Sequence, residues 1–181
     1  MNMYFIALVA PDDINQKILK WKEWMKERFS CEVALRSPAH ITLIPPFWMQ
    51  PDLEKVLIDS IKEFSAGVKS FSILLKDFSC FQPKVIFTNV VKNDELLHLK
   101  QDLEQFLLSA NKFPINKDDR VFHPHVTLAT RDLYKKAFYE AWEYFKEKKY
   151  EAQWQAEGLS LLRHNQKKWD VIATSHYKTL L

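Results

Sequence analysis

The sequence predicts a two-lobed protein that mixes helices and β-strands, with the two halves of the chain related by a pseudo-two-fold axis. Two observations lead to this prediction. The motif His-x-Thr-Leu occurs twice, as His40-Ile41-Thr42-Leu43 and as His125-Val126-Thr127-Leu128. The motifs also lie at matching positions, since 36 residues separate Tyr4 from His40 and 39 separate Ile86 from His125. Self-similarity on this scale is typical of an internal repeat.

Each motif is expected to form a strand with one apolar and one polar face. Successive side chains of a strand alternate between its faces, so His40 and Thr42 share one face while Ile41 and Leu43 share the other. The second motif has the same pattern. If both motif strands lie beside the pseudo-two-fold axis, the two polar faces meet. The cleft between the lobes is then the predicted site.

The elements of the first half follow from periodicity and turn residues. They are a strand over residues 4–9, a helix capped by Asp12 or Asp13, an irregular segment over 30–39, the first motif strand, a helix capped by Asp52, and a strand over 71–78. Ile14, Ile18 and Met25 recur at helical spacing and form the buried stripe of the first helix. Pro45-Pro46 is expected to interrupt the motif strand, because neither proline can donate a ladder hydrogen bond.

The second half repeats this order. It contains a strand over residues 85–91 that returns antiparallel, a helix capped by Asn93 or Asp94, an irregular segment over 111–120, the second motif strand, a helix over 134–145, and strands over 157–163 and 169–174. No linker rich in Pro, Ser or Gly separates the halves. We therefore expect a single domain over 1–181, with lobes at approximately 1–84 and 85–181, and leave open whether strands are exchanged between them.

Composition excludes several classes of protein. The 181 residues are 47% hydrophobic and 27% charged, as in a soluble globular protein. The two glycines are too few for a Walker loop or a dinucleotide fingerprint, and there is no H-E-x-x-H and no Gly-flanked serine. The two cysteines, Cys31 and Cys80, form no C-x-x-C pattern, so neither a disulfide framework nor a zinc knuckle is indicated.

Net charge and hydropathy limit the kinds of partner that we expect for this protein. A net charge of +3 and a pI near 8.7 permit an anionic substrate but fall short of the dense basic patch of a duplex DNA-binding protein. The apolar segment over residues 4–9 is too short to span a membrane. A cytoplasmic protein without membrane contact is expected.

Two imidazoles facing each other across a cleft suit acid–base catalysis. At neutral pH one can accept a proton while the other donates one. This is the chemistry that cleaves a phosphodiester, and threonine hydroxyls two residues away can hydrogen-bond the phosphoryl oxygens. No metal or other cofactor is needed.

The two His-x-Thr-Leu motifs, the Phe-x-Pro-His form of the second at 122–125, the stretch Pro83-Lys84-Val85-Ile86-Phe87 and the chain length together resemble the two-histidine (2H) phosphoesterase superfamily. Within it, the likeness is to the branch called the 2′-5′ RNA ligase or RNA 2′,3′-cyclic phosphodiesterase family. The resemblance implies a bilobal α+β fold, with antiparallel sheets around a central cleft and helices on the outside.

The resemblance also implies the reaction and its residues. The enzyme would hydrolyse 2′,3′-cyclic phosphate ends of RNA or nucleotides to 2′-phosphates in RNA processing, or in reverse form a 2′-5′ linkage. Catalytic roles are implied for His40, Thr42, His125 and Thr127, with the first histidine as acid and the second as base. RNA ends or cyclic nucleotides are the expected partners of a monomer.

Residues beside the motifs are further candidates. Arg131 lies three residues after Leu128, whereas many relatives have Arg two residues after, and it could reach the phosphate. Phe47, Trp48 and Phe122 flank the motifs and could stack on a nucleobase. The first motif continues as Ile44-Pro45-Pro46-Phe47 where many relatives have Phe-Leu-Gly, so the rim beside His40 differs. Action on another cyclic or 2′-5′ nucleotide, and a non-catalytic module that binds RNA ends, are the alternatives.

Overall fold

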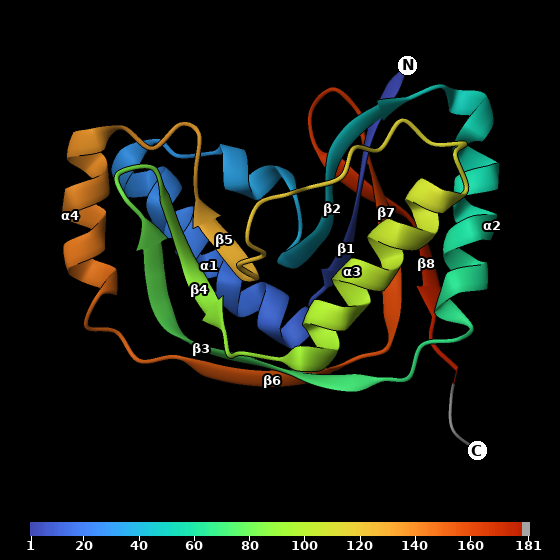
Figure 1. Ribbon diagram of the computed structural model, residues 1–181. Helices are drawn as coiled ribbons and strands as arrows, with labels where there is room; N and C mark the ends of the chain where they lie inside the picture. Colours follow the sequence, from blue (N-terminus) through green and yellow to red (C-terminus); the bar gives the residue numbers. More distant parts are fainter. Residues whose placement is uncertain (179–181) are drawn as a thin grey trace.

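The computed structural model describes residues 1–178 and contains two antiparallel four-stranded sheets and four α-helices (Figure 1). The predicted α+β fold is confirmed. One sheet has the order β2-β1-β7-β8 and the other the order β5-β4-β3-β6. The strands are β1 (Asn2–Val9), β2 (His40–Met49), β3 (Phe71–Phe81), β4 (Val85–Val90), β5 (His125–Ala129), β6 (Glu151–Ala156), β7 (Gly158–His164) and β8 (Trp169–His176). The helices are α1 (Asp12–Phe29), α2 (Glu54–Ser65), α3 (Asp94–Ser109) and α4 (Lys135–Phe145), with short 3-10 segments at Val33–Arg36 and Pro51–Leu53.

Each sheet takes strands from both halves of the chain. β3 leaves the first half to pair with β4 and β6, while β7 and β8 return from the second half to β1. The helices cross as well, since α1 packs against β5 and α3 against β2, whereas α2 covers β7 and β8 and α4 covers β3 and β4. The sheets therefore do not coincide with residues 1–84 and 85–181, and residues 179–181 lie outside the described part. One apolar core runs through both sheets.

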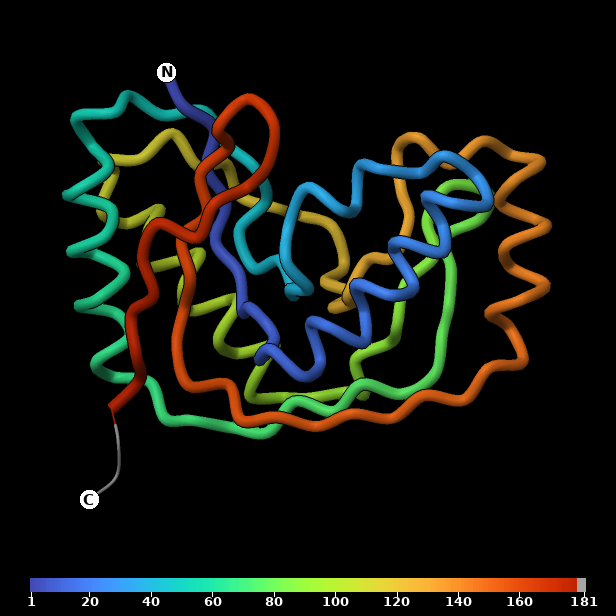
Figure 2. Tube along the Cα trace, turned by 180° about the vertical axis from the view of Figure 1, so that it is seen from behind, coloured from blue at the N-terminus to red at the C-terminus, as the bar shows by residue number. Residues whose placement is uncertain are grey.

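The two motif strands face each other between the sheets. β2 and β5 are edge strands of their respective sheets, and they contact one another. Both views show them in the middle of the molecule, with α2 and α4 at opposite ends (Figures 1 and 2). The pseudo-symmetric repeat thus brings the two polar faces to one place.

Burial along the motif strands follows the predicted alternation. Ile41 and Leu43 are 0% and 1% exposed, and Val126 and Leu128 are likewise 0% and 1% exposed. Each buried aliphatic side chain contributes roughly 1.5–3 kcal/mol of hydrophobic stabilisation. These residues fix the register of both strands, because a shift by one residue would expose them and bury the imidazoles.

The prolines do not end β2, which corrects the expectation of an interruption. β2 runs through Pro45 and Pro46 to Met49, and its pairing with β1 shifts between Tyr4, opposite Phe47, and Ile6, opposite Ile44. The two prolines occupy this bulge. They are tolerated because β2 is an edge strand and a bulge leaves ladder positions unpaired.

Two of the predicted helix caps are wrong. Pro11 is the N-cap of α1 and Leu53 that of α2, both without a side-chain cap hydrogen bond. Asp12 instead lies in the first turn of α1, where its charge favours the helix dipole, and Asp52 lies in a 3-10 turn. The Asn93 cap is confirmed, since its Oδ1 accepts from the Leu96 N–H at 2.8 Å.

β6 was not predicted from the sequence. Its residues, Glu-Ala-Gln-Trp-Gln-Ala, include no β-branched side chain, although the last four alternate between exposed glutamine and the buried Trp154 and Ala156. It is the edge strand beside β3. Pairing with a long neighbour, rather than intrinsic propensity, makes this segment extended.

Candidate active site

The motif residues line two adjoining hollows between β2 and β5. The first, the His40 hollow, has a volume of about 210 Å³ and is lined by His40, Thr42 and Thr127. The second, the His125 hollow, has a volume of about 290 Å³ and is lined by Thr42 and His125. Thr42 borders both, so the two hollows adjoin, and we refer to them together as the cleft.

Both imidazoles are held in the same way by backbone. Nδ1 of His40 lies 2.7 Å from the Pro38 carbonyl oxygen, and Nδ1 of His125 lies 2.7 Å from the His123 carbonyl oxygen. A carbonyl only accepts hydrogen bonds, so in each ring Nδ1 carries the proton and donates it. The neutral tautomer then leaves the Nε2 lone pair of each ring free to accept a proton from a substrate or water.

An aromatic ring from the neighbouring strand packs against each imidazole. Phe5 of β1 lies 4.9 Å from His40 between ring centroids, and Phe87 of β4 lies 4.7 Å from His125. Phe5 and Phe87 are 3% and 0% exposed. Each imidazole is thus restricted by a buried phenylalanine, although the two phenylalanines are not equivalent in the repeat: Phe87 pairs with Thr127, whereas the residue that pairs with Thr42 is Ala7.

Burial keeps both histidines neutral in the free protein. Burial is the main cause that lowers the pKa of His40 from 6.5 to about 4. The hydrogen bond to the Pro38 carbonyl raises this pKa, and the charges of Lys22 and His125 lower it further. Burial also lowers the pKa of His125, with the neighbouring His123 adding to the effect. Proton transfer therefore begins from two neutral rings unless an anion enters the cleft.

Lys22 is a buried cation behind His40. It is 3% exposed, and its Nζ donates to the Ser37 carbonyl at 3.0 Å. Within residues 1–178, no carboxylate lies at ion-pair distance from this ammonium group. A second contact from α1, Asn15 Oδ1 to the Ala39 N–H at 2.7 Å, holds the same loop. α1 thus fixes the backbone that leads into His40.

The other candidate residues are placed differently. Arg131 is exposed and lines the His40 hollow, and Phe122 is half-buried and lines the His125 hollow. Phe47 is 8% exposed and packs against Tyr4 with ring centroids 6.2 Å apart, and it also lines a groove beside the His125 hollow. Because its ring is largely buried in the core, we leave it out of the proposed substrate contacts. His123 is exposed and lines the His125 hollow.

Sequence reasoning missed two residues that line the cleft, Trp169 and Arg120, and one that is buried behind it, Lys22. Lys22 stands four residues after Ile18, on the apolar stripe of α1. A lysine on a buried stripe is unusual, and this could have indicated a functional role from the sequence alone. Trp169 lines the His40 hollow and its ring packs edge-on against Phe5 at 4.6 Å. Arg120 lines the His125 hollow. The positions of Trp169 and Arg120 depend on tertiary contacts that local pattern does not encode.

The described residues offer no ready metal site. Within residues 1–178, no group of three or more His, Cys, Asp and Glu side chains gathers as a ligand set. None of the helices formed by these residues has both the length and the apolarity needed to cross a bilayer.

Two antiparallel sheets whose facing edge strands each present a His-x-Thr motif define the two-histidine class of fold. The model of the 2′-5′ RNA ligase superfamily matches residues 10–168. The chain belongs to this superfamily, as the resemblance of its motifs predicted.

Relatives and solved structures agree with this placement. A predicted phosphoesterase of Geobacillus kaustophilus is 29% identical over 132 residues, which are 72% of this chain and 69% of that protein. A predicted phosphoesterase of Bacillus licheniformis is 28% identical over 108 residues, 59% of this chain and 60% of that protein. TT0787 of Thermus thermophilus shares the fold with a TM-score of 0.67 at 16% identity, over 97% of both chains. E. coli LigT complexed with 3′-AMP has a TM-score of 0.67 at 15% identity, over 98% of this chain and 99% of that one.

Proposed function

We propose that the protein is a metal-independent phosphoesterase that hydrolyses 2′,3′-cyclic phosphate ends of RNA or nucleotides to 2′-phosphates. The observation that carries this proposal is the matched pair of imidazoles, each anchored through Nδ1 at 2.7 Å with Nε2 left free. Membership of the superfamily supports the chemistry. Structures of E. coli LigT with 3′-AMP, ATP and phosphate support nucleotides as the ligand class.

The reaction follows from the two free Nε2 atoms. One imidazole takes a proton from water as the water oxygen bonds to phosphorus. The bond from phosphorus to the 3′ oxygen breaks. The other ring, which has taken a proton from solvent on Nε2 when the anionic substrate binds and so acts as imidazolium, gives that oxygen its proton. The product is a 2′-phosphomonoester with a free 3′ hydroxyl. In this proposal Thr42 and Thr127 donate hydrogen bonds to the phosphoryl oxygens, and Arg131 offsets their charge.

The surroundings of the two rings differ in a way that favours one assignment of roles. The Lys22 ammonium group opposes protonation of His40, whereas the group that opposes protonation of His125 is another imidazole, that of His123. When a phosphodiester anion enters and raises both pKa values, His125 takes the proton more readily. We therefore assign the acid to His125 and the base to His40, the reverse of what the resemblance implies.

The central test is loss of turnover in His40→Ala and in His125→Ala. Each variant should retain the wild-type circular dichroism spectrum and lose at least about 100-fold in kcat on a nucleoside 2′,3′-cyclic phosphate. EDTA should leave the wild-type rate unchanged. Full activity in either variant would refute the assignment. Tight binding of the cyclic phosphate without hydrolysis over hours would favour the non-catalytic binding module instead.

A leaving group that needs no proton separates acid from base. On a nucleoside phosphodiester with p-nitrophenolate as leaving group, the variant without the acid should recover most of its rate. The variant without the base should stay inactive. Recovery is expected for His125→Ala. Recovery for His40→Ala would reverse the assignment and leave the proposed reaction intact.

A further inference from the structure

A second groove continues from the His125 hollow along β2. We name it the Trp48 groove. It has a volume of about 490 Å³, and its lining includes Pro45, Pro46, Trp48, Asn116, Lys117 and Arg120. Pro45, Asp118 and Arg120 also line the His125 hollow, so the groove opens directly from the proposed active site.

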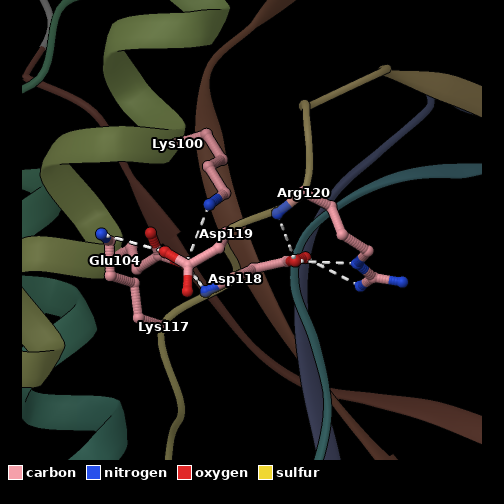
Figure 3. Close-up of polar contacts among 6 residues, drawn as sticks. All are labelled: Lys100, Glu104, Lys117, Asp118, Asp119 and Arg120. Carbon is pink, nitrogen blue, oxygen red and sulfur yellow. Dashed lines mark hydrogen bonds and ion pairs between the residues drawn. The ribbon is translucent and has the colours of Figure 1, made fainter.

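Arg120 stands at the junction of the groove and the hollow, and its guanidinium is held in place. Asp118 binds it through two hydrogen bonds, Nε to Oδ1 and Nη2 to Oδ2, each 2.8 Å long (Figure 3). Arg120 lowers the pKa of Asp118 to about 2, so the pair stays charged at any working pH. Of the five N–H groups of arginine, three remain free for a ligand. The Arg120 side chain is 79% exposed, so water alone covers those donors.

This arrangement is anchored in the interior. The backbone N–H of Asp118 donates to Glu104 Oε1 at 3.0 Å, and Lys100 Nζ binds the same oxygen at 2.8 Å (Figure 3). The Lys100 and Glu104 side chains are only 8% and 10% exposed. A buried ion pair is weak evidence for stability on its own, because desolvation opposes it. Here it fixes the loop that presents Arg120 to the cleft.

The groove also offers an aromatic surface at its far end. Trp48 is 55% exposed, an unusual position for a large apolar ring. Thr42 and Trp48 are six residues apart on β2, which corresponds to roughly 20 Å of strand. This length exceeds one nucleotide. Single-stranded RNA is recognised by stacking of its bases on exposed aromatic rings and by contacts to its phosphates.

We propose that Arg120 and the Trp48 groove form a subsite for the nucleotides that precede the reacting end, so that a single-stranded oligoribonucleotide is preferred over a mononucleotide. This inference rests on the proposed function. Arg120 would bind an internucleotide phosphate and Trp48 would stack on a base further from the end. Asp118 and Asp119 offset the nearby cations, Asp119 through an ion pair with Lys117 at 3.0 Å. Arg120 therefore contributes directed hydrogen bonds in addition to its charge.

The experiment compares a nucleoside 2′,3′-cyclic phosphate with di- and trinucleotides that carry the same end. The measured quantity is the ratio of kcat/KM for the trinucleotide to that for the mononucleotide. Wild type should show a ratio well above one, and Arg120→Gln should lower the ratio about 10-fold or more, the effect of a charge-assisted hydrogen bond. Trp48→Ala should lower it as well. Lys55→Gln, an exposed change on α2, is the matched control and should keep the wild-type ratio.

Salt gives a second readout. Release of counterions from one single-stranded phosphate contributes about −0.7 to the slope of log affinity against log salt. Arg120→Gln should reduce the wild-type slope for the trinucleotide by about this amount. If Arg120 has only a structural role, Arg120→Gln should lower kcat/KM equally for the mononucleotide and the trinucleotide. The slope of log affinity against log salt should then stay unchanged.

The outcomes separate this inference from the proposed function. Equal kcat/KM for all substrate lengths in wild type, or an unchanged ratio in Arg120→Gln, would overturn the subsite while hydrolysis stands. If no substrate is hydrolysed, the proposed function fails. Fluorescence anisotropy of a 5′-labelled trinucleotide with a 3′-terminal phosphate then decides the subsite, because Arg120→Gln should still weaken its binding. Equal competition by duplex RNA would also contradict it.

Discussion

Replacing Lys22 with methionine should leave the protein at least as stable as wild type while changing the titration of His40. Lys22 lies between Ile18 and Met25 on the buried stripe of α1, so methionine fits the position in shape and polarity. Burial lowers the pKa of Lys22 from 10.5 to about 8. At about 1.36 kcal/mol per pH unit, the charged form costs about 3 kcal/mol at neutral pH. Loss of the hydrogen bond to Ser37 offsets about 1.5–3 kcal/mol of this.

The net expectation is a gain of about 0–2 kcal/mol in the free energy of unfolding at pH 7, measured by urea denaturation. The pH dependence of the free energy of unfolding tests whether burial destabilises the charged form of Lys22. Between pH 8 and 10.5 the folded protein has lost the Lys22 proton while the unfolded chain still holds it, so wild-type stability should rise with pH. Lys22→Met should lack this rise. Lys20→Met, an exposed change on the same helix, should behave as wild type.

The same substitution tests the site. Removal of the ammonium group should raise the pKa of His40 from about 4 toward, but not to, 6.5, because burial remains the larger cause. NMR of the His Cε1–H resonances measures this directly. A loss of more than about 2 kcal/mol of stability together with an unmoved His40 would refute the reasoning, since Lys22 would then be a structural residue that stabilises the fold.

Two further predictions concern stability. Because the pKa of His40 lies near 4 in the fold and near 6.5 when unfolded, stability should fall as pH drops from 6.5 to 4, where only the unfolded chain takes the proton. His40→Gln should show a smaller fall, and equal falls would contradict this account. Asn93→Ala should cost about 1–2 kcal/mol by thermal denaturation, because Oδ1 caps α3 and Nδ2 donates to the Ser72 carbonyl at 2.7 Å. Asn93→Asp keeps the cap but loses the hydrogen bond to Ser72, so its stability should lie between those of wild type and Asn93→Ala.

The sequence by itself determined the repeat and the polarity of the motif strands. His40 and His125 alternate with buried aliphatic side chains, and the period of a strand is two, so local pattern suffices to assign their faces. The sequence narrowed the cap of α3 to Asn93 or Asp94, and the structure assigns it to Asn93. The two motifs and the residues around them gave a resemblance to the 2H superfamily, and the match of the 2′-5′ RNA ligase superfamily model over residues 10–168 established membership.

Only the tertiary structure decided which strands share a sheet and what surrounds the imidazoles. β3, β7 and β8 join the sheets opposite to their own halves, because strand pairing is non-local and no local period records it. The prolines of β2 are tolerated at an edge, which sequence alone does not identify. The pKa of His40 is set by burial and by Lys22, 18 positions away in the chain, and Arg120 reaches the cleft only because a buried ion pair on α3 holds its loop. Each of these depends on distances between residues far apart in sequence.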